Sequence, residues 1–283
     1  MKTEIFVNPN FSYLTSFVNQ IPLGFNSMGI ELHHGRNEVR KVSVDELLVT
    51  VKYFKRITLA NRFIFATIRK SKAQRAYEHS RMLIRKNLTS PEPVAYVNCY
   101  RYGLLYKSFY VSLYTNYSSL TKLLDIPIAE SEEGLKAFAR FTYNLHSNGI
   151  LHDDYTVNNV LYSNYGNDYD FSLIDNNRMR FRNYSYRRGL RNLERLKIPV
   201  DKMGVIALEY AKEAHASELK TLNAMVFFRL HYILKVSFKK WVKAAIRLFS
   251  GKHDELYSMQ LKDLSVKSQD EKLSKKVSYK VNI

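Results

Sequence analysis

The sequence predicts an α+β protein in two parts, a small sheet-rich N-terminal part with one helix and a larger helical C-terminal part. Up to about residue 115, β-branched and aromatic runs with alternating polarity dominate, and beyond it apolar residues recur at helical spacing. The 283 residues are 46% hydrophobic, enough to bury a core in both parts. We therefore expect one part over 1–115 and the other over 116–283.

The strongest strand signal of the first part is the β-branched and aromatic run over 47–54, which predicts a central strand. Good helix formers over 71–87, with Ala76, Tyr77 and Leu83 among them, predict the single helix. That helix must end before Pro91 and Pro93, because proline cannot continue a helix. The remaining strands are expected over 28–30, 37–44, 94–102 and 108–114.

The second part begins with helical periodicity. Over 132–148, Leu135, Phe138 and Leu145 recur at helical spacing, and Gly149 follows as a natural terminator. Two short strands are expected over 159–162 and 171–174 with a polar turn between them, and helices over 202–249. The last 20 or so residues are polar and lysine-rich, and we expect them to fray.

Composition narrows the class of protein. The chain has 44 lysines and arginines against 26 acidic residues, a net charge of +18, which attracts nucleic acid, anionic membranes or anionic substrates. Cys99 is the only cysteine, so no intramolecular disulfide is possible. No apolar run approaches the roughly 20 residues that span a bilayer. The first residues are too polar for a signal peptide, and we expect a cytoplasmic protein.

The most informative segment lies between the predicted helix and the strand at 159–162. It holds His152 and Asp154, followed five residues later by Asn159, and Asp175 stands at the end of the next strand. A hydroxyl that attacks a phosphoryl group needs a carboxylate to orient it and accept its proton, which is a role for Asp154. Hard divalent cations prefer oxygen ligands, which Asn159 and Asp175 supply from two adjacent strand turns.

This order of residues resembles the catalytic loop and metal-binding aspartate of the protein-kinase-like superfamily, over about residues 30–250. The resemblance implies a bilobal fold, ATP and Mg²⁺ as cofactors, Asp154 as catalytic base, and Asn159 and Asp175 as metal ligands. It also implies a phosphate-binding lysine on a strand, held by a glutamate from the following helix. Lys52 is the favoured lysine and Lys55 its competitor. Glu78, the only acidic residue of the predicted helix, is the expected partner.

Several features depart from protein kinases. The turn expected to cover the phosphates has one glycine, Gly35, where protein kinases have three, and Arg36 is expected to add a phosphate contact. Asp153 replaces the arginine that normally precedes the catalytic aspartate, so control by activation-loop phosphorylation is not expected. Asn176 and Asn177 follow Asp175 in place of Phe-Gly, and no Ala-Pro-Glu comes after them. The sequence therefore does not predict an ordinary protein kinase.

Arginines concentrate directly after Asp175, where seven occur between residues 178 and 195 with Glu194 as the one acidic residue. Guanidinium groups bind carboxylate and phosphate bidentately, which predicts a polyanionic acceptor, although a solvated basic helix face is the alternative. The residues expected to bind the acceptor are Arg178, Arg180, Arg182, Arg187 and Arg188.

Together with segments 89–96 and 174–179, this cluster resembles the bacterial lipopolysaccharide kinase family, the Kdo and heptose kinases. The resemblance implies phosphorylation of a sugar hydroxyl in the lipid A–core region, an anionic glycolipid at the cytosolic face of the inner membrane. Alternatives are a kinase for a soluble sugar, an antibiotic or tyrosine, a pseudokinase, and a nucleic-acid-binding module. We expect no nucleic acid and no obligate protein partner.

A basic amphipathic helix is predicted near the C-terminus. Lys235, Lys239, Lys243 and Arg247 recur every four residues, beside an apolar face that includes Trp241. Such a helix can lie on an anionic membrane, or it can pack its apolar face on the helical part. The sequence leaves both open.

Overall fold

The computed structural model describes residues 2–55, 57–166 and 168–249. The chain divides into two compact units, residues 1–229 and 230–283. The strands of both predicted parts and the predicted catalytic segment lie within the first unit. The predicted boundary at 115/116 falls between the two main sheets of that unit. The expected frayed tail lies outside the described residues.

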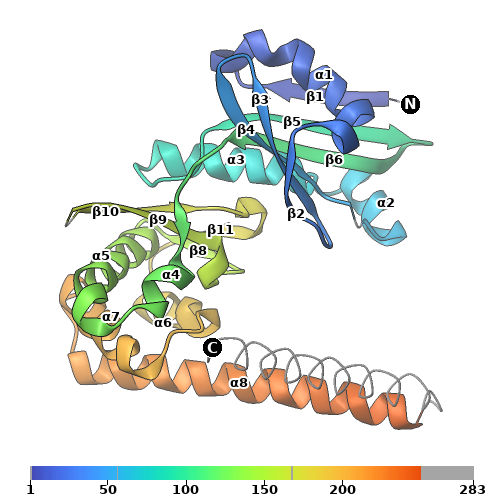
Figure 1. The fold of residues 1–283 in the computed structure, drawn as a ribbon. Coiled ribbons are helices and arrows are strands. Elements are labelled where there is room, and N and C mark those ends of the chain that lie inside the picture. Colours follow the sequence, from blue (N-terminus) through green and yellow to red (C-terminus); the bar gives the residue numbers. More distant parts are fainter. Residues whose placement is uncertain (1, 56, 167, 250–283) are drawn as a thin grey trace, which may run out of the picture. The chain divides into compact units, whose positions relative to one another are not determined.

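A six-stranded antiparallel sheet forms the N-terminal part (Figure 1). The strand predicted over 47–54 is β4, and it lies inside the sheet between β6 and β3, which confirms its central place. In spatial order the strands are β1 (Lys2–Val7), β5 (Pro93–Arg101), β6 (Leu104–Leu113), β4 (Leu47–Tyr53), β3 (Glu38–Val44) and β2 (Ile30–His33).

Residues of β4 alternate between the two faces of this sheet, as the pleat requires. Val49 and Val51 are fully buried in one apolar cluster with residues of helix α1 (Thr15–Gly24). Helix α3 (Lys72–Arg85) packs on the sheet in a second cluster, which also holds Phe54. Thr50 and Lys52, the alternate residues of β4, line a cavity on the other face from Val49 and Val51.

The sequence predicted one helix in the N-terminal part, α3, whereas the described residues of this part form three α-helices. Helix α1 contains Pro22 and has no acidic residue in its first turn, so its helical signal is weak. Helix α2 (Leu59–Thr67) is short and begins where the Thr58 hydroxyl accepts from the Asn61 N–H at 3.4 Å. Both helices depend on packing against the sheet more than on local propensity.

The C-terminal part is mainly helical, as predicted. Its core gathers Leu135, Phe138 and Leu145 from α5 with Ile206 and Tyr210 from α7. The helices are α4 (Leu120–Asp125), α5 (Ile128–Ser147), α6 (Tyr186–Asn192), α7 (Val200–Glu213) and α8 (Glu218–Phe249). Short 3₁₀ helices lie at Pro9–Leu14, Phe25–Ser27, Val157–Asn159, Asn176–Arg178 and Leu193–Arg195.

Small strands frame the predicted catalytic segment. Helix α5 ends before Gly149, which has φ of +73° and approaches a neighbouring backbone so closely that a Cβ there would lie 1.9 Å from the Arg182 carbonyl oxygen. One sheet has the order β10 (Asp168–Leu173), β9 (Val160–Tyr165), β7 (Ser118–Ser119), and the other pairs β11 (Met179–Phe181) with β8 (Ile150–His152).

Helix α8 begins in the first unit and continues into the second. In the second unit the rings of Phe238 and Trp241 stack with centroids 6.0 Å apart. The side chain of Arg247, the last member of the predicted basic stripe, lies outside the described residues. Among the helices that the structure describes, none combines the length and apolarity needed to cross a membrane.

Candidate active site

The hairpin of β9 and β10 brings two of the predicted site residues to one end. Val160 pairs with Leu173, and just beyond this pair the Ile174 N–H donates to the Asn159 carbonyl at 3.1 Å. Asn159 and Asp175 therefore lie on opposite arms of the hairpin at its open end. This is the convergence expected from their positions at neighbouring strand turns.

Asp175 is held in an unusual backbone conformation, with φ of +59° in the left-handed region. One carboxylate oxygen accepts from the Lys52 ammonium at 2.6 Å and from the Asn177 amide at 2.5 Å. Burial tends to raise the pKa of Asp175, but the adjacent Lys52 charge and hydrogen bond outweigh it, and the net pKa lies below its usual range. The carboxylate is thus ionised at neutral pH. Asn177, in the segment that departs from the kinase pattern, was not predicted as a site residue.

The structure separates the two candidate lysines. Lys52 lies on the cavity side of β4 and reaches Asp175 from the sheet. Lys55 follows the strand and pairs with Glu38 at 2.5 Å, and this hydrogen bond lowers the pKa of Glu38. Only Lys52 of these two lysines contacts a predicted metal ligand.

Glu78 does not meet Lys52 in this structure. Its carboxylate accepts from the Lys70 ammonium at 2.8 and 2.9 Å and from the Gln74 side chain at 3.1 Å. Ala76, two residues earlier on α3, lines the cavity beside Lys52. Since residues two apart on a helix point in nearly opposite directions, Glu78 faces away from the site. The expected Lys52–Glu78 pair is replaced by the Lys52–Asp175 pair.

A largely apolar cavity of about 190 Å³ opens beside this pair, and we call it the central cavity. Strands β4 and β6, helix α3 and the β9–β10 hairpin all contribute to its wall. Lys52 and Asp175 lie at its charged side. The turn with Gly35 and Arg36 joins β2 and β3, whose residues Leu32 and Val39 also line the cavity. An apolar wall with one charged side suits a planar base that carries an anionic tail.

The loop with Asp154 is fixed by backbone hydrogen bonds. Burial lowers the pKa of His152, and the neutral ring accepts from the Asp154 N–H at 3.1 Å and donates to the Ile174 carbonyl at 3.2 Å. The side chain of Asn192, in α6, accepts from the His152 backbone N–H at 3.1 Å and donates to the His152 carbonyl at 2.8 Å. The Asn159 amide donates to the Asp154 carbonyl at 2.9 Å. Both ring nitrogens of His152 are therefore engaged in holding the loop.

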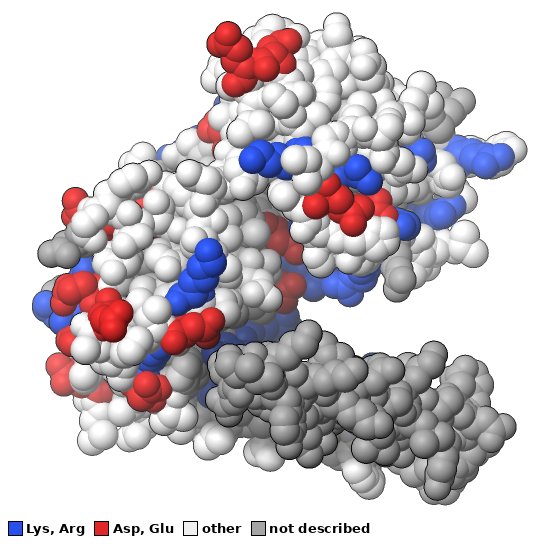
Figure 2. All heavy atoms as spheres, in the orientation of Figure 1, with Lys and Arg blue, Asp and Glu red and all other residues white. Residues whose placement is uncertain are grey.

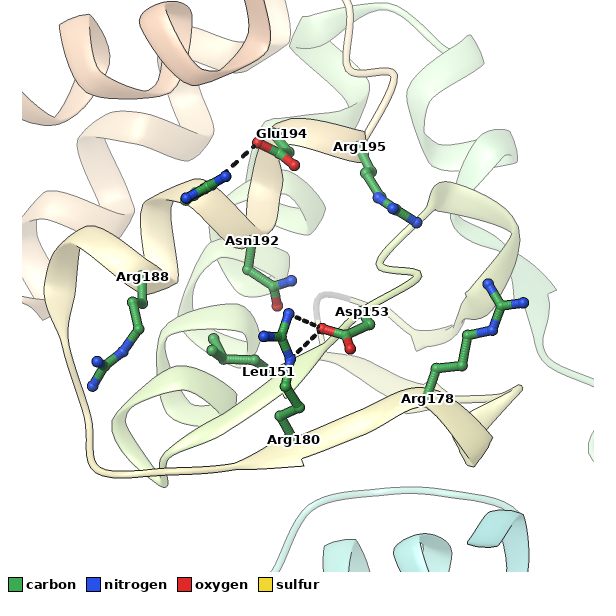
Figure 3. Close-up of a pocket in the computed structure, with 9 residues that line it drawn as sticks. Leu151, Asp153, Arg178, Arg180, Arg188, Asn192, Glu194 and Arg195 are labelled. Atoms are coloured by element: carbon green, nitrogen blue, oxygen red, sulfur yellow. Dashed lines mark hydrogen bonds and ion pairs between the residues drawn. The ribbon is translucent and has the colours of Figure 1, made fainter. Parts of the chain in front are cut away.

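Two arginines contact the Asp154 carboxylate. Arg195 donates to one oxygen at 3.1 Å, and Arg178 lies 3.6 Å from the other. Both line an adjacent pocket of about 490 Å³, which we call the arginine pocket (Figure 3). Arg195 belongs to the predicted cluster but was not among the residues expected to bind the acceptor. The full lining is Leu151, Asp153, Arg178, Arg180, Arg188, Arg191, Asn192, Glu194 and Arg195.

Three of the five predicted acceptor-binding arginines, at positions 178, 180 and 188, thus share one pocket, whereas Arg182 and Arg187 are not part of its lining. Within it Asp153 binds the Arg180 guanidinium, which accounts for an acidic residue in the place usually held by arginine. Figure 2 shows that acidic side chains gather in separate clusters on the face it draws, with basic ones between them.

The donor set suits a magnesium ion that is shared with phosphate groups. In the described part of the chain, no group of three or more His, Cys, Asp and Glu side chains could hold a metal ion. Mg²⁺, however, is usually bound by one or two side-chain oxygens, with phosphates and water completing its shell. Asp175 offers a carboxylate, and Asn159 keeps its side-chain oxygen because only its amide nitrogen is engaged in a hydrogen bond. These two residues therefore fit that kind of site.

Comparison with known proteins agrees with this geometry. A solved structure of WaaP in complex with acyl carrier protein matches with a TM-score of 0.58 and 15% sequence identity, covering 83% of this chain and 98% of that one. The likeness confirms the predicted kinase-like fold. No curated protein matches the chain. The lipopolysaccharide kinase (Kdo/WaaP) family matches residues 35–214, more than half of the chain and all of the predicted catalytic segment. This protein is therefore a member of the lipopolysaccharide kinase (Kdo/WaaP) family.

Proposed function

We propose that this protein is an ATP- and Mg²⁺-dependent kinase that transfers the γ-phosphoryl group to a sugar hydroxyl of the lipid A–core region, on Kdo or heptose. One observation carries the proposal. Lys52 and Asp175 lie at the charged side of an apolar cavity, and Asn159 lies across the hairpin from the segment that holds Asp175. Asp154 contacts Arg178 and Arg195, which line the neighbouring arginine pocket. Family membership supports phosphoryl transfer and the acceptor class.

In this proposal each residue has one task. Asp154 orients the acceptor hydroxyl and takes its proton, while Lys52 binds the α- and β-phosphates. Asn159 and Asp175 would hold Mg²⁺, which when bound neutralises the charge of the transferred phosphates. Most acceleration in this chemistry comes from positioning and charge neutralisation, so each carboxylate should matter by orders of magnitude.

The arginine pocket is the proposed acceptor site. Five arginines line it against two acidic residues, Asp153 and Glu194, so the pocket has an excess of positive charge. Carboxylate and phosphate groups of a glycolipid match the planar fork of guanidinium. Because Arg178 and Arg195 also contact Asp154, an anionic group bound there would bring a neighbouring hydroxyl close to the proposed base. A substrate of this kind would be met at the cytosolic face of the inner membrane.

The decisive assay incubates the protein with γ-labelled ATP, Mg²⁺ and extracted Kdo–lipid A or heptose-containing core glycolipid. Because the matched WaaP was solved with acyl carrier protein, the reaction is run with and without that protein. We expect labelled glycolipid from the wild type and none from Asp154→Ala, which should still bind ATP. Asp175→Ala should lose metal-dependent nucleotide binding. Near wild-type turnover by either variant would refute the role given to that residue.

The same assay separates the alternatives. Label on the protein itself would favour a tyrosine kinase, and ATP binding without any labelled glycolipid would favour a pseudokinase or another acceptor. For the acceptor site, Arg188→Ala should raise the KM for glycolipid about tenfold and leave the KM for ATP unchanged, since one charge-assisted contact is lost. Arg101→Ala, at the end of β5, removes the same charge far from the pocket in sequence and serves as the control.

A further inference from the structure

One face of helix α3 carries three basic side chains, Lys72, Arg75 and His79, at i, i+3 and i+7. The Arg75 guanidinium donates to the Asn177 carbonyl at 2.9 Å, and the His79 ring donates to the Asn176 carbonyl at 2.6 Å. Both carbonyls belong to the segment that directly follows Asp175. This face of α3 therefore lies against the proposed metal-binding turn.

Lys72 is the first member of this row and the one without a protein acceptor. Among the residues that the structure describes, it forms no hydrogen bond or ion pair, and its ammonium lies 5.9 Å from the centroid of the buried Phe54 ring. Lys52 approaches the same ring, with its ammonium 5.4 Å from the centroid. Two lysines, one from the sheet and one from α3, thus converge on a single aromatic side chain beside the central cavity.

Positive charge is concentrated at this point. Burial lowers the pKa of Lys72, the charges of Arg178, Arg36 and Arg75 lower it further, and Asp175 alone opposes them. Lys72 is also in the first turn of α3, where the helix dipole disfavours a cation. An unpaired ammonium in such a field is unfavourable in the empty protein, and an anion in the site would relieve it.

We propose that Lys72 is a second phosphate-binding lysine and binds the terminal phosphates of the nucleotide beside Lys52. The inference rests on the proposed use of ATP. In this assignment the inward face of α3 contacts the phosphates directly through Lys72. The sequence had instead predicted that α3 would supply Glu78, whose role would be to orient Lys52. The anionic charge that Lys52 needs comes from Asp175 instead.

Isothermal titration of ATP and of AMP, each with Mg²⁺, tests this assignment. Lys72→Gln should raise the Kd for ATP about tenfold, because one charge-assisted hydrogen bond to phosphate is lost. The Kd for AMP, which lacks the terminal phosphates, should not change. Lys72→Arg should keep most of the ATP affinity. Lys86→Gln removes the same charge where α3 ends, where Lys86 is exposed, and should behave like the wild type.

Each other result has a definite meaning. An unchanged Kd for ATP in Lys72→Gln refutes the assignment, and so does an equal loss for ATP and AMP, which would indicate a structural role. A raised KM for glycolipid with unchanged ATP binding would mean that Lys72 binds a phosphate of the acceptor, which also overturns it. If the wild type binds no ATP, the proposed function itself fails, and this outcome is read before any variant is compared.

Discussion

His146, at the end of α5, links the helical core to the catalytic loop and should make the stability of the protein sensitive to mild acid. Its Nε2–H donates to the Asn192 side-chain oxygen at 3.2 Å, and its Nδ1 accepts from the Tyr210 hydroxyl at 3.0 Å. The same Asn192 holds the backbone of His152. Burial lowers the pKa of His146 to about 4, so the ring is neutral in the folded protein.

The direction of the pH dependence follows from the coupling of proton binding to unfolding. In the unfolded chain the pKa of a histidine is about 6.5. Below that pH the unfolded state therefore binds a proton, whereas the folded state does not until the pH approaches its own lower pKa. Stability is therefore lost as the pH falls from the unfolded pKa toward the folded one. With a folded pKa of about 4, the loss is about 2 kcal/mol at a pH near 5 and about 3 kcal/mol at a pH near 4.

Urea unfolding at a series of pH values measures this loss, and His146→Gln provides the comparison because it cannot titrate. The variant should be less stable at neutral pH, since it removes packing and hydrogen bonds. Its curve should fall less steeply than that of the wild type between about pH 6.5 and pH 5, where most carboxylates are still ionised. The difference between the two curves cancels the contribution of His152, whose pKa burial also lowers. Parallel curves would refute the reasoning.

Two further predictions concern close packing and the choice of lysine. Gly189→Ala should destabilise the protein by about 1–3 kcal/mol in urea unfolding, because a Cβ there would lie 2.5 Å from the Tyr210 hydroxyl. A Cβ at Gly204, in α7, would meet open space. Gly204→Ala should therefore be neutral or stabilising by up to about 1 kcal/mol. In steady-state kinetics with ATP, Lys52→Met should lower kcat/KM by about two to three orders of magnitude, whereas Lys55→Met, which loses only its pairing with Glu38, should stay within about threefold. Equal losses in the two lysine variants would contradict the separation of their roles.

Local patterns predicted the elements that have strong periodicity of their own. The run at 47–54 and the helix before Gly149 appear as β4 and α5 because alternation and helical spacing are visible within the segment. Helix α1 was missed for the opposite reason. It contains Pro22, and its helical state depends on burial against strands that lie far away in the sequence. Local propensity cannot report such packing.

The site residues divide in the same way. The contact between Lys52 and Asp175 joins residues 123 positions apart, and the sequence predicted Glu78, not Asp175, as the partner of Lys52. Arg195 approaches Asp154 through the 3₁₀ helix that follows α6, which no spacing rule anticipates. Such contacts depend on how the elements pack in three dimensions. The sequence indicates them only where it resembles a family whose fold is known.

The phase of α3, in contrast, was available from the sequence. Its buried residues are Ala73, Ala76, Tyr77, Ser80 and Leu83, a small and apolar stripe that a helical wheel would have revealed. At about 100° per residue, Glu78 is about 200° from Ala76 and therefore turned from the cavity. Lys72, four residues before Ala76, is in phase with it. Glu78 was predicted as the partner of Lys52 because it is the only acidic residue of the helix, and that prediction did not take the helical phase into account. A helix can offer the site only the residues of its inward face, and on α3 the charged residues of that face are Lys72 and Arg75, not Glu78.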